Sequence, residues 1–151
     1  VLVPESNPMT ADDWAALRRQ LIKHEGLRLQ PYRDSVGLLT IGVGRCLDRK
    51  GISQQEAYDL LRNDYLDVYE QLQVKLPWFN GLSAIRKRVL IDMGFNLGMP
   101  GLLKFKTTLA CVERGDYESA ARAMVKSKWA SQVKSRALRL AEMMRSNAEQ
   151  P

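Results

Sequence analysis

Residues 27–50 interrupt a chain whose apolar side chains otherwise recur at helical spacing. β-forming residues gather in this segment, and Gly37, Gly42 and Gly44 punctuate them. Such a mixture of β-formers and turn residues predicts a small antiparallel hairpin sheet. Because this is the only clear β segment in the sequence, the fold class that follows is α+β, mostly α.

Helix signals lie on both sides of this segment. Thr10 is a candidate N-cap for a first helix that ends near Glu25. Ser53 and Glu56 have the spacing of a capping box, which predicts a long helix over residues 54–74. Further helices are expected over residues 83–97, 107–113, 117–126 and 134–147.

The order of these elements predicts one domain with two lobes. Residues 1–9 have the composition of a flexible leader or a non-native remnant. Residues 10–151 are expected to form a single domain of ordinary size. Its parts are a small N-terminal lobe with the hairpin sheet, a linking helix and a helical C-terminal lobe, at about 10–60, 54–74 and 75–151.

The net charge of +6 favours anionic partners such as nucleic acid, a membrane surface or a bacterial envelope. An ordinary basic surface is the other interpretation, because no basic run has the length of a nucleic-acid arm. Cys46 and Cys111 are too few for a disulfide scaffold, and we expect free buried thiols, with a single bridge as the alternative. No Cys–His spacing indicates zinc, and we expect no metal or other cofactor.

Two carboxylates and a hydroxyl accompany the predicted hairpin, namely Glu25, Asp34 and Thr40. A glycosidase needs one carboxyl group that stays protonated to donate to the leaving oxygen, and a second that stays ionised. A helix end beside a cleft suits the acid, and the polar rim of a hairpin suits the second carboxylate. Alone these residues are weak support, since most such acids are surface residues. The alternative for Thr40 is a strand residue with an exposed hydroxyl.

With these residues in view, the sequence resembles the phage-type lysozymes of T-even phages, glycoside hydrolase family 24. Glu25, Asp34 and Thr40 match the catalytic spacing of that family, and Thr40 opens its Thr-Ile-Gly-x-Gly string. The resemblance continues in Phe-Asn-Leu-Gly from Phe95, and in Lys-Ser-Lys-Trp followed by Arg136. It covers most of the chain and implies a lysozyme-like fold.

The resemblance also implies a role for each of the three residues. Glu25 would protonate the glycosidic oxygen as the general acid. Asp34 would help to activate water and stabilise developing positive charge, and Thr40 would hold the attacking water on the opposite face of the sugar. This is inverting chemistry, which requires carboxyl groups roughly 6.5–9.5 Å apart.

Six further positions are implied to bind substrate, namely Gly44, Cys46, Phe95, Asn96, Thr108 and Gln132. At Gly44 we expect the sugar to approach the backbone closely, with a plain turn as the alternative. Asn96 is expected to hydrogen-bond substrate, whereas core packing is the better expectation for Phe95. Cys46 occupies an apolar place in the family, which affects substrate preference rather than the reaction.

Arg136 matches the family arginine that reaches the catalytic glutamate, so we expect an ion pair between Glu25 and Arg136. The alternative is a solvated arginine on a helix face. Arg45 stands where the best-studied family pattern has a histidine paired with an aspartate, and Asp64 aligns with that aspartate. We therefore expect an Arg45–Asp64 salt bridge that stays charged at every physiological pH.

The function implied is that of an endolysin muramidase that cleaves the β-1,4 bond between N-acetylmuramic acid and N-acetylglucosamine in bacterial peptidoglycan. The expected protein is a monomer that binds peptidoglycan, does not bind nucleic acid and does not insert stably into membranes. It would accumulate in the host cytoplasm, reach the periplasm and cell wall with a holin, and lyse the host. A tail-associated lysozyme is the less favoured setting, because no tail-assembly segment is visible.

Two other classes of function remain open. One is a catalytically inactive peptidoglycan-binding module, against which the intact Glu25, Asp34 and Thr40 argue. The other is a membrane-permeabilising protein that acts through its basic C-terminal helix. We expect the apolar face of that helix to pack on the core instead.

Overall fold

The computed structural model describes residues 8–151. The predicted leader over residues 1–9 lies mostly outside the described residues, and Pro8 and Met9 are exposed. The chain divides into two compact units, Val1–Ala57 and Tyr58–Pro151, and the boundary falls inside a helix. The grouping of both units into one two-lobed domain stays a prediction.

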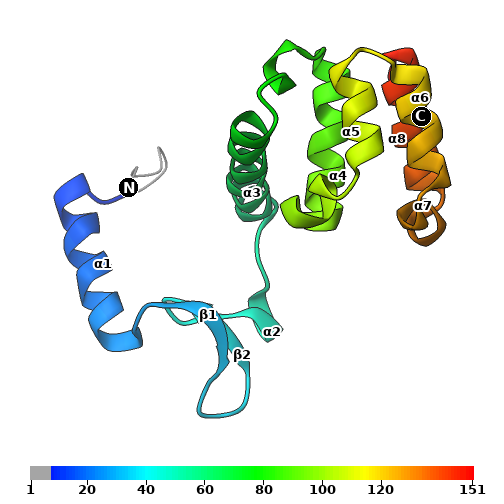
Figure 1. Cartoon of the computed structure of the whole chain (residues 1–151). Helices are drawn as coiled ribbons and strands as arrows, with labels where there is room; N and C mark the ends of the chain where they lie inside the picture. Colours follow the sequence, from blue (N-terminus) through cyan, green and yellow to red (C-terminus); the bar gives the residue numbers. More distant parts are fainter. Residues whose placement is uncertain (1–7) are drawn as a thin grey trace. The chain divides into compact units, whose positions relative to one another are not determined.

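The first unit contains a helix, a three-stranded sheet, a short helical turn and the start of a long helix (Figure 1). In chain order the elements are α1 (Ala11–Glu25), β1 (Arg28–Arg33), β2 (Leu39–Gly42), β3 (Arg45–Cys46), α2 (Leu47–Lys50) and α3 (Gln54–Lys75). The strand order is β1-β2-β3 with both pairs antiparallel, which confirms the sheet predicted for residues 27–50. α2 was not predicted, because so short a helix leaves no periodic pattern.

Helix α1 begins and ends at the residues that the sequence indicates. The Asp13 N–H donates to the Thr10 hydroxyl oxygen (3.1 Å), which caps the first turn. Gly26 follows the last helical residue with a φ of +81°, a conformation that favours glycine. Both ends were predicted, and together they make Glu25 the last helical residue.

Helix α3 starts at the predicted capping box. The Ser53 N–H donates to Glu56 Oε1 (2.9 Å), and the Glu56 N–H donates to Ser53 Oγ (3.1 Å). This reciprocal pair satisfies two donors that a helix start leaves without an intrahelical partner. The helix predicted over residues 54–74 is confirmed as Gln54–Lys75.

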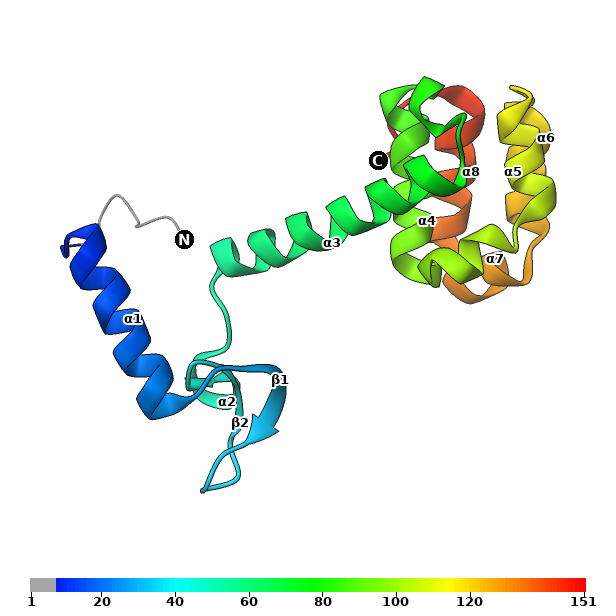
Figure 2. The ribbon, with the colours of Figure 1, turned by 60° about the vertical axis from the view of Figure 1, so that its left-hand side comes forward.

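The second unit is helical and holds the apolar core. After α3 it contains a 3-10 turn (Phe79–Gly81), α4 (Ala84–Leu103), α5 (Lys106–Glu113), α6 (Tyr117–Lys126), α7 (Lys128–Val133) and α8 (Ser135–Ser146). Helix α6 packs against both α5 and α8, and α4 packs against α8 (Figure 2). The core includes the fully buried side chains of Leu72, Phe79, Leu90, Met93, Leu102, Met124 and Met144.

The helix expected over residues 83–97 continues further than predicted. Gly98 is non-helical (φ 72°, ψ 159°), as its break signal indicates, but the helix resumes and runs to Leu103. Pro100 lies in the first turn after this break, where its missing N–H costs no hydrogen bond. Helix α7 was not predicted either. The Ala130 N–H donates to the Ser127 side chain at its start (3.2 Å), in a segment too short for a periodic signal.

The C-terminal helix packs on the core, as expected. Its buried residues are Ala137, Leu140, Ala141, Met143 and Met144. The apolar face that a membrane-permeabilising helix would need is therefore occupied in the folded unit. Within residues 8–151, no helix combines the length and the apolar character that a membrane crossing requires.

Arg86 joins the start of α4 to the end of α8. Its Nε donates to the Met144 carbonyl oxygen (2.8 Å) and its Nη2 to the Arg145 carbonyl oxygen (3.2 Å). The guanidinium carbon lies 3.4 Å from the centroid of the Tyr117 ring. The last carbonyls of a helix lack intrahelical donors and carry partial negative charge, so a cation stabilises them.

Arg86→Ala should therefore lower the free energy of unfolding by about 2 kcal/mol, because two charge-assisted hydrogen bonds and a cation–π contact are lost together. The matched control is Arg122→Ala, which removes an exposed ion pair with Glu118 (3.6 Å). Its cost should stay below about 1 kcal/mol. Urea unfolding followed by circular dichroism measures both, and equal losses would show that Arg86 does not join the two helix ends.

Candidate active site

Glu25 lies at the C-terminal end of α1 with an exposed side chain. Its carboxylate lies against the backbone of Gly44, in the turn between β2 and β3. A Cβ placed on Gly44 would be 2.9 Å from Glu25 Oε2 and 3.2 Å from Glu25 Cδ. The end of the Glu25 side chain thus occupies space that a side chain at residue 44 would fill.

Asp34 lies in the turn between β1 and β2, and its own turn orients it. Its Oδ1 accepts hydrogen bonds from the Val36 N–H (3.0 Å) and the Leu38 N–H (2.8 Å). The Asp34 N–H donates to the Leu38 carbonyl oxygen (2.9 Å), and Gly37 has a φ of +86°. This compact turn fixes the carboxylate without help from a distant residue.

Thr40 lies in the middle strand, paired with Tyr32 on one side and Cys46 on the other. Its side chain is only 4% exposed, so the alternative of a strand residue with an exposed hydroxyl is wrong. The hydroxyl donates to the Leu38 carbonyl oxygen (3.0 Å). With its one hydrogen used in this way, Thr40 Oγ1 can act toward a further partner only as an acceptor.

Leu38 therefore connects the two candidate residues of the hairpin. Its N–H holds the Asp34 carboxylate, and its carbonyl oxygen holds the Thr40 hydroxyl. The structure thus places Glu25, Asp34 and Thr40 in one unit. Asp34 lies in the hairpin turn and Thr40 in the middle strand of the sheet. The Glu25 carboxylate lies next to Gly44. Two carboxyl groups are what glycoside hydrolysis requires, and Glu25 and Asp34 are the candidates for them in this unit.

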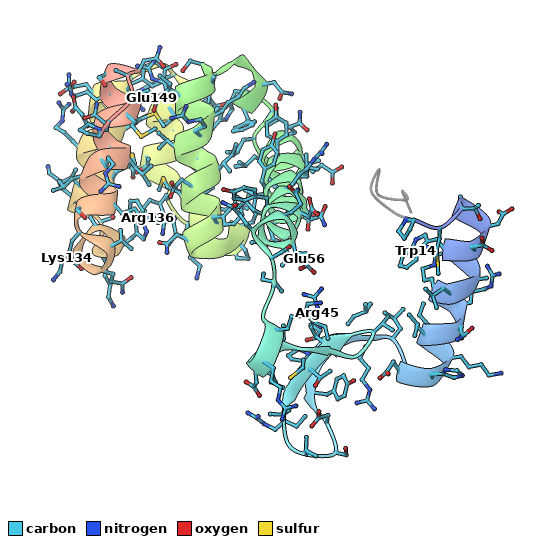
Figure 3. The ribbon with its side chains drawn as sticks, turned by 180° about the vertical axis from the view of Figure 1, so that it is seen from behind. Trp14, Arg45, Glu56, Lys134, Arg136 and Glu149 are labelled. Carbon is cyan, nitrogen blue, oxygen red and sulfur yellow. The ribbon has the colours of Figure 1, made fainter. Side chains whose placement is uncertain are left out.

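Arg45 has a carboxylate partner, Glu56, that the sequence did not indicate. The Arg45 guanidinium binds both carboxylate oxygens of Glu56, at 3.0 Å and 2.8 Å, and also donates to the Gly51 carbonyl oxygen (3.0 Å). Figure 3 shows the two side chains facing each other between the sheet and the start of α3. Asp64 lies in the other unit, so its expected pairing with Arg45 stays a prediction. The sequence had identified Glu56 only as the capping-box partner of Ser53.

This network lowers the pKa of Glu56 to about 2. The largest cause is the hydrogen bond from Arg45, followed by the backbone and side-chain hydrogen bonds with Ser53. The same hydrogen bond raises the pKa of Arg45. Both groups therefore stay charged over the physiological pH range.

Arg136 has a carboxylate partner that the sequence did not indicate. In the second unit its Nε and Nη2 bind Asp92 Oδ1, at 2.8 Å and 2.6 Å. The Arg136 side chain is 40% exposed, so it is both ion-paired and partly solvated on its helix face. Asp92 and Arg136 lie on α4 and α8, too far apart in the chain for any spacing pattern to link them. Glu25 lies in the other unit, so its ion pair with Arg136 stays a prediction.

Phe95 lies outside the core of its unit, contrary to the expected packing. It is 40% exposed and lines a cavity of about 590 Å³ together with Asp92 and Arg136. The next residue, Asn96, accepts a hydrogen bond from Trp129 Nε1 (2.6 Å). Its side-chain nitrogen retains donor hydrogens that can bind another group.

The remaining predicted substrate residues lie on other elements, with Thr108 on α5, Gln132 on α7 and Cys46 on β3. Thr108 is only 3% exposed and borders a separate cavity of about 300 Å³ beside Trp129. Gln132 is exposed on α7. Cys46 is half-buried and Cys111 is buried, and both are free thiols. The expectation of free thiols is confirmed, although only Cys111 is fully buried.

The first unit thus holds Asp34 in the β1–β2 turn, Thr40 in the middle strand and Glu25 at the end of α1. A family model described as phage lysozyme matches residues 22–149, most of the chain. The chain belongs to the phage lysozyme family, which confirms the resemblance seen in the sequence.

Several curated proteins are similar. Over 83% of its length, the chain is 28% identical to the pre-baseplate central spike protein Gp5 of Enterobacteria phage T4, of which it spans 27%. It is 24% identical to the probable T4-type lysozyme 1 of Dictyostelium discoideum, covering 83% of the chain and 91% of that protein. It is 32% identical to the SAR-endolysin of Escherichia phage Mu, covering 68% of the chain and 60% of that protein. The chain thus spans about a quarter of the spike protein.

The lowered pKa of Glu56 predicts an acid-dependent loss of stability. A carboxylate with a folded-state pKa of about 2, against an ordinary value of 4.5, stabilises the fold fully above about pH 4.5. This contribution is lost as the pH falls from there through 2. Glu56→Gln removes the titrating group, so urea unfolding between about pH 5 and pH 2 should depend less on pH than in the wild type.

Asp64→Asn is the matched control for this experiment, because it changes the carboxylate that the family alignment assigned to Arg45. Its unfolding should keep the pH dependence of the wild type. The reverse result, with Asp64→Asn flattening the profile and Glu56→Gln leaving it intact, would favour the family pairing.

Proposed function

We propose that this protein is a muramidase that hydrolyses the β-1,4 bond between N-acetylmuramic acid and N-acetylglucosamine in bacterial peptidoglycan. The observation that carries the proposal is that Leu38 hydrogen-bonds both Asp34 and Thr40. Its N–H donates to the Asp34 carboxylate, and its carbonyl oxygen accepts from the Thr40 hydroxyl, in the same unit as Glu25. Membership of the phage lysozyme family supports the same chemistry.

In the proposed mechanism Glu25 is the general acid and protonates the glycosidic oxygen as the bond breaks. Water attacks the opposite face of the sugar. Thr40 Oγ1, whose hydrogen is committed to Leu38, accepts a hydrogen bond from this water. Asp34 accepts a proton from the water and stabilises the positive charge that develops on the sugar. The anomeric configuration is inverted, because water attacks in a single displacement.

The predicted substrate contacts of the second unit belong to the proposal as well. Asn96 would offer its amide hydrogens to a sugar or stem-peptide carbonyl, and Phe95 would present an exposed ring. The predicted Glu25–Arg136 ion pair would steady the acid. Thr108, which borders the cavity beside Trp129, would be a further contact.

For the biological setting we propose an endolysin that lyses the host cell, which the similarity to a SAR-endolysin supports. As a monomer made in the host cytoplasm, it would reach the wall with a holin. The similarity to a central spike protein supports a second candidate, a lysozyme carried on a phage tail. Immunoblotting of purified virions separates the two settings, since only the second places the chain in the particle.

Glu25→Gln should lower the turnover of purified peptidoglycan by about 10²- to 10⁴-fold, because the amide cannot donate the acid proton. Glu113→Gln is the matched control, since Glu113 is also an exposed glutamate at the last position of a helix. Mass spectrometry of the wild-type products should find N-acetylmuramic acid at the new reducing end. Wild-type protein that binds peptidoglycan without cleaving it would establish the binding module instead. Equal lysis of permeabilised cells by wild type and Glu25→Gln would establish membrane disruption.

Thr40→Val should lower kcat by about 10²-fold, because the buried shape is kept while the oxygen that accepts from the attacking water is lost. Thr40→Ser retains that oxygen and should stay within about tenfold of the wild type. Steady-state rates on solubilised glycan strands, compared at equal folded protein by circular dichroism, measure both. Full activity in the valine variant would remove Thr40 from the mechanism.

A further inference from the structure

Gly42 and Gly44 share a backbone conformation but differ in the atoms that surround the position of a Cβ. Gly42 ends β2 and Gly44 lies in the following turn, and their φ values of +70° and +68° favour glycine at both positions for the same reason. A Cβ on Gly42 would meet no atom within 4 Å. A Cβ on Gly44 would lie 2.9 Å from Glu25 Oε2, closer than real side chains approach. A side chain at residue 44 would therefore meet Glu25 in addition to the backbone strain that both positions share.

We propose that Gly44 is a positioning residue for the general acid, and that its missing side chain is the space in which the Glu25 carboxylate rests. This inference rests on the proposed function. It differs from the expectation that Gly44 admits the sugar to the backbone, because in the structure the space above Gly44 is taken by Glu25.

The carboxylate has few other constraints within its own unit. No hydrogen bond or ion pair with another described residue of the first unit, residues 8–57, holds it. The side chain is exposed and unbranched, so several rotamers compete for it. The approach to Gly44 is therefore the contact that relates the Glu25 carboxylate to the sheet in which Thr40 lies.

A side chain at residue 44 would displace the Glu25 carboxylate rather than the backbone of the fold. The three nearest atoms to the added Cβ are Oε2, Cδ and Cγ of Glu25, the end of a flexible side chain. To reach ordinary contact at about 3.4 Å, the carboxylate must move by about 0.5 Å or more. A displacement of this order matters, because a misplacement of about 1 Å in a catalytic site can cost about 10²-fold in rate.

The test compares Gly44→Ala with Gly42→Ala, which imposes the same backbone strain without the contact. Gly44→Ala should lower kcat by about 10- to 100-fold and change KM by less than about threefold. Gly42→Ala should change both by less than about threefold per folded molecule. In the Glu25→Gln background, Gly44→Ala should add no further loss of kcat, since it acts through the acid.

Three kinetic results would overturn the inference. Equal effects of the two alanine variants would assign the loss to backbone strain. A rise in KM with kcat unchanged would mean that Gly44 makes room for the sugar. A further loss in the Glu25→Gln background would show that Gly44 acts without the acid.

A second measurement does not depend on activity. Crystal structures of the wild type and Gly44→Ala should show the Glu25 carboxylate displaced by about 0.5 Å or more, with the sheet unmoved. An unmoved carboxylate beside a shifted turn would overturn the inference. If the wild type proves inactive on peptidoglycan, the proposed function fails, and this structural comparison still decides whether Gly44 positions Glu25.

Discussion

The bidentate contact between Arg45 and Glu56 is the interaction on which the first unit depends. Glu56 caps the first turn of α3 and at the same time binds the guanidinium of β3. Arg45 also holds the Gly51 carbonyl oxygen, so the segment between β3 and α3 is closed from both ends. An isolated surface ion pair contributes little, but a bidentate pair within a network of hydrogen bonds is the exception.

This network acts on the site through the sheet. Arg45 pairs with Ile41 and Cys46 with Thr40, so β3 lies beside the middle strand that carries the candidate hydroxyl. Leu39, at the start of the middle strand, donates its N–H to Asp48 Oδ2 on α2 (2.7 Å). Hydrogen bonds that begin at the cap of α3 thus hold the strand on which Thr40 lies. The fold positions the site through backbone pairing, and each anchoring side chain binds main-chain groups or a cap.

The features that the sequence predicted correctly depend on neighbouring residues. The Thr10 cap, the Ser53–Glu56 capping box and the break at Gly98 each involve groups a few residues apart, so local chemistry decides them. Asp34 belongs to this class, since its own turn orients it. The catalytic roles came from the family resemblance instead, because two acids and a threonine specify no reaction.

The features that the sequence missed involve packing between distant segments. Nothing near Arg136 indicates Asp92, because the helices that carry them meet only in the folded unit. Phe95 was assigned to the core from its size, whereas its helical neighbours Met93 and Gly94 are the buried residues. Arg45 binds Glu56, which the sequence indicated only as the capping residue of the long helix. In each case the sequence did not indicate what the side chain contacts in the folded unit, because hydrophobic periodicity does not specify contacts between distant segments.

Asp92 also changes what Arg136 can do chemically. A lone arginine near a general acid would stabilise the ionised form and so oppose proton donation. The Asp92 carboxylate offsets this charge, and its bonds with Nε and Nη2 fix the plane of the guanidinium. A carboxyl group that binds Arg136 therefore contacts an Arg136–Asp92 ion pair whose net charge is close to zero. The orientation of the guanidinium in this pair is fixed, unlike that of an unpaired arginine. Such a pair can orient a carboxyl group while interfering less with its protonation, and a proton donor needs both.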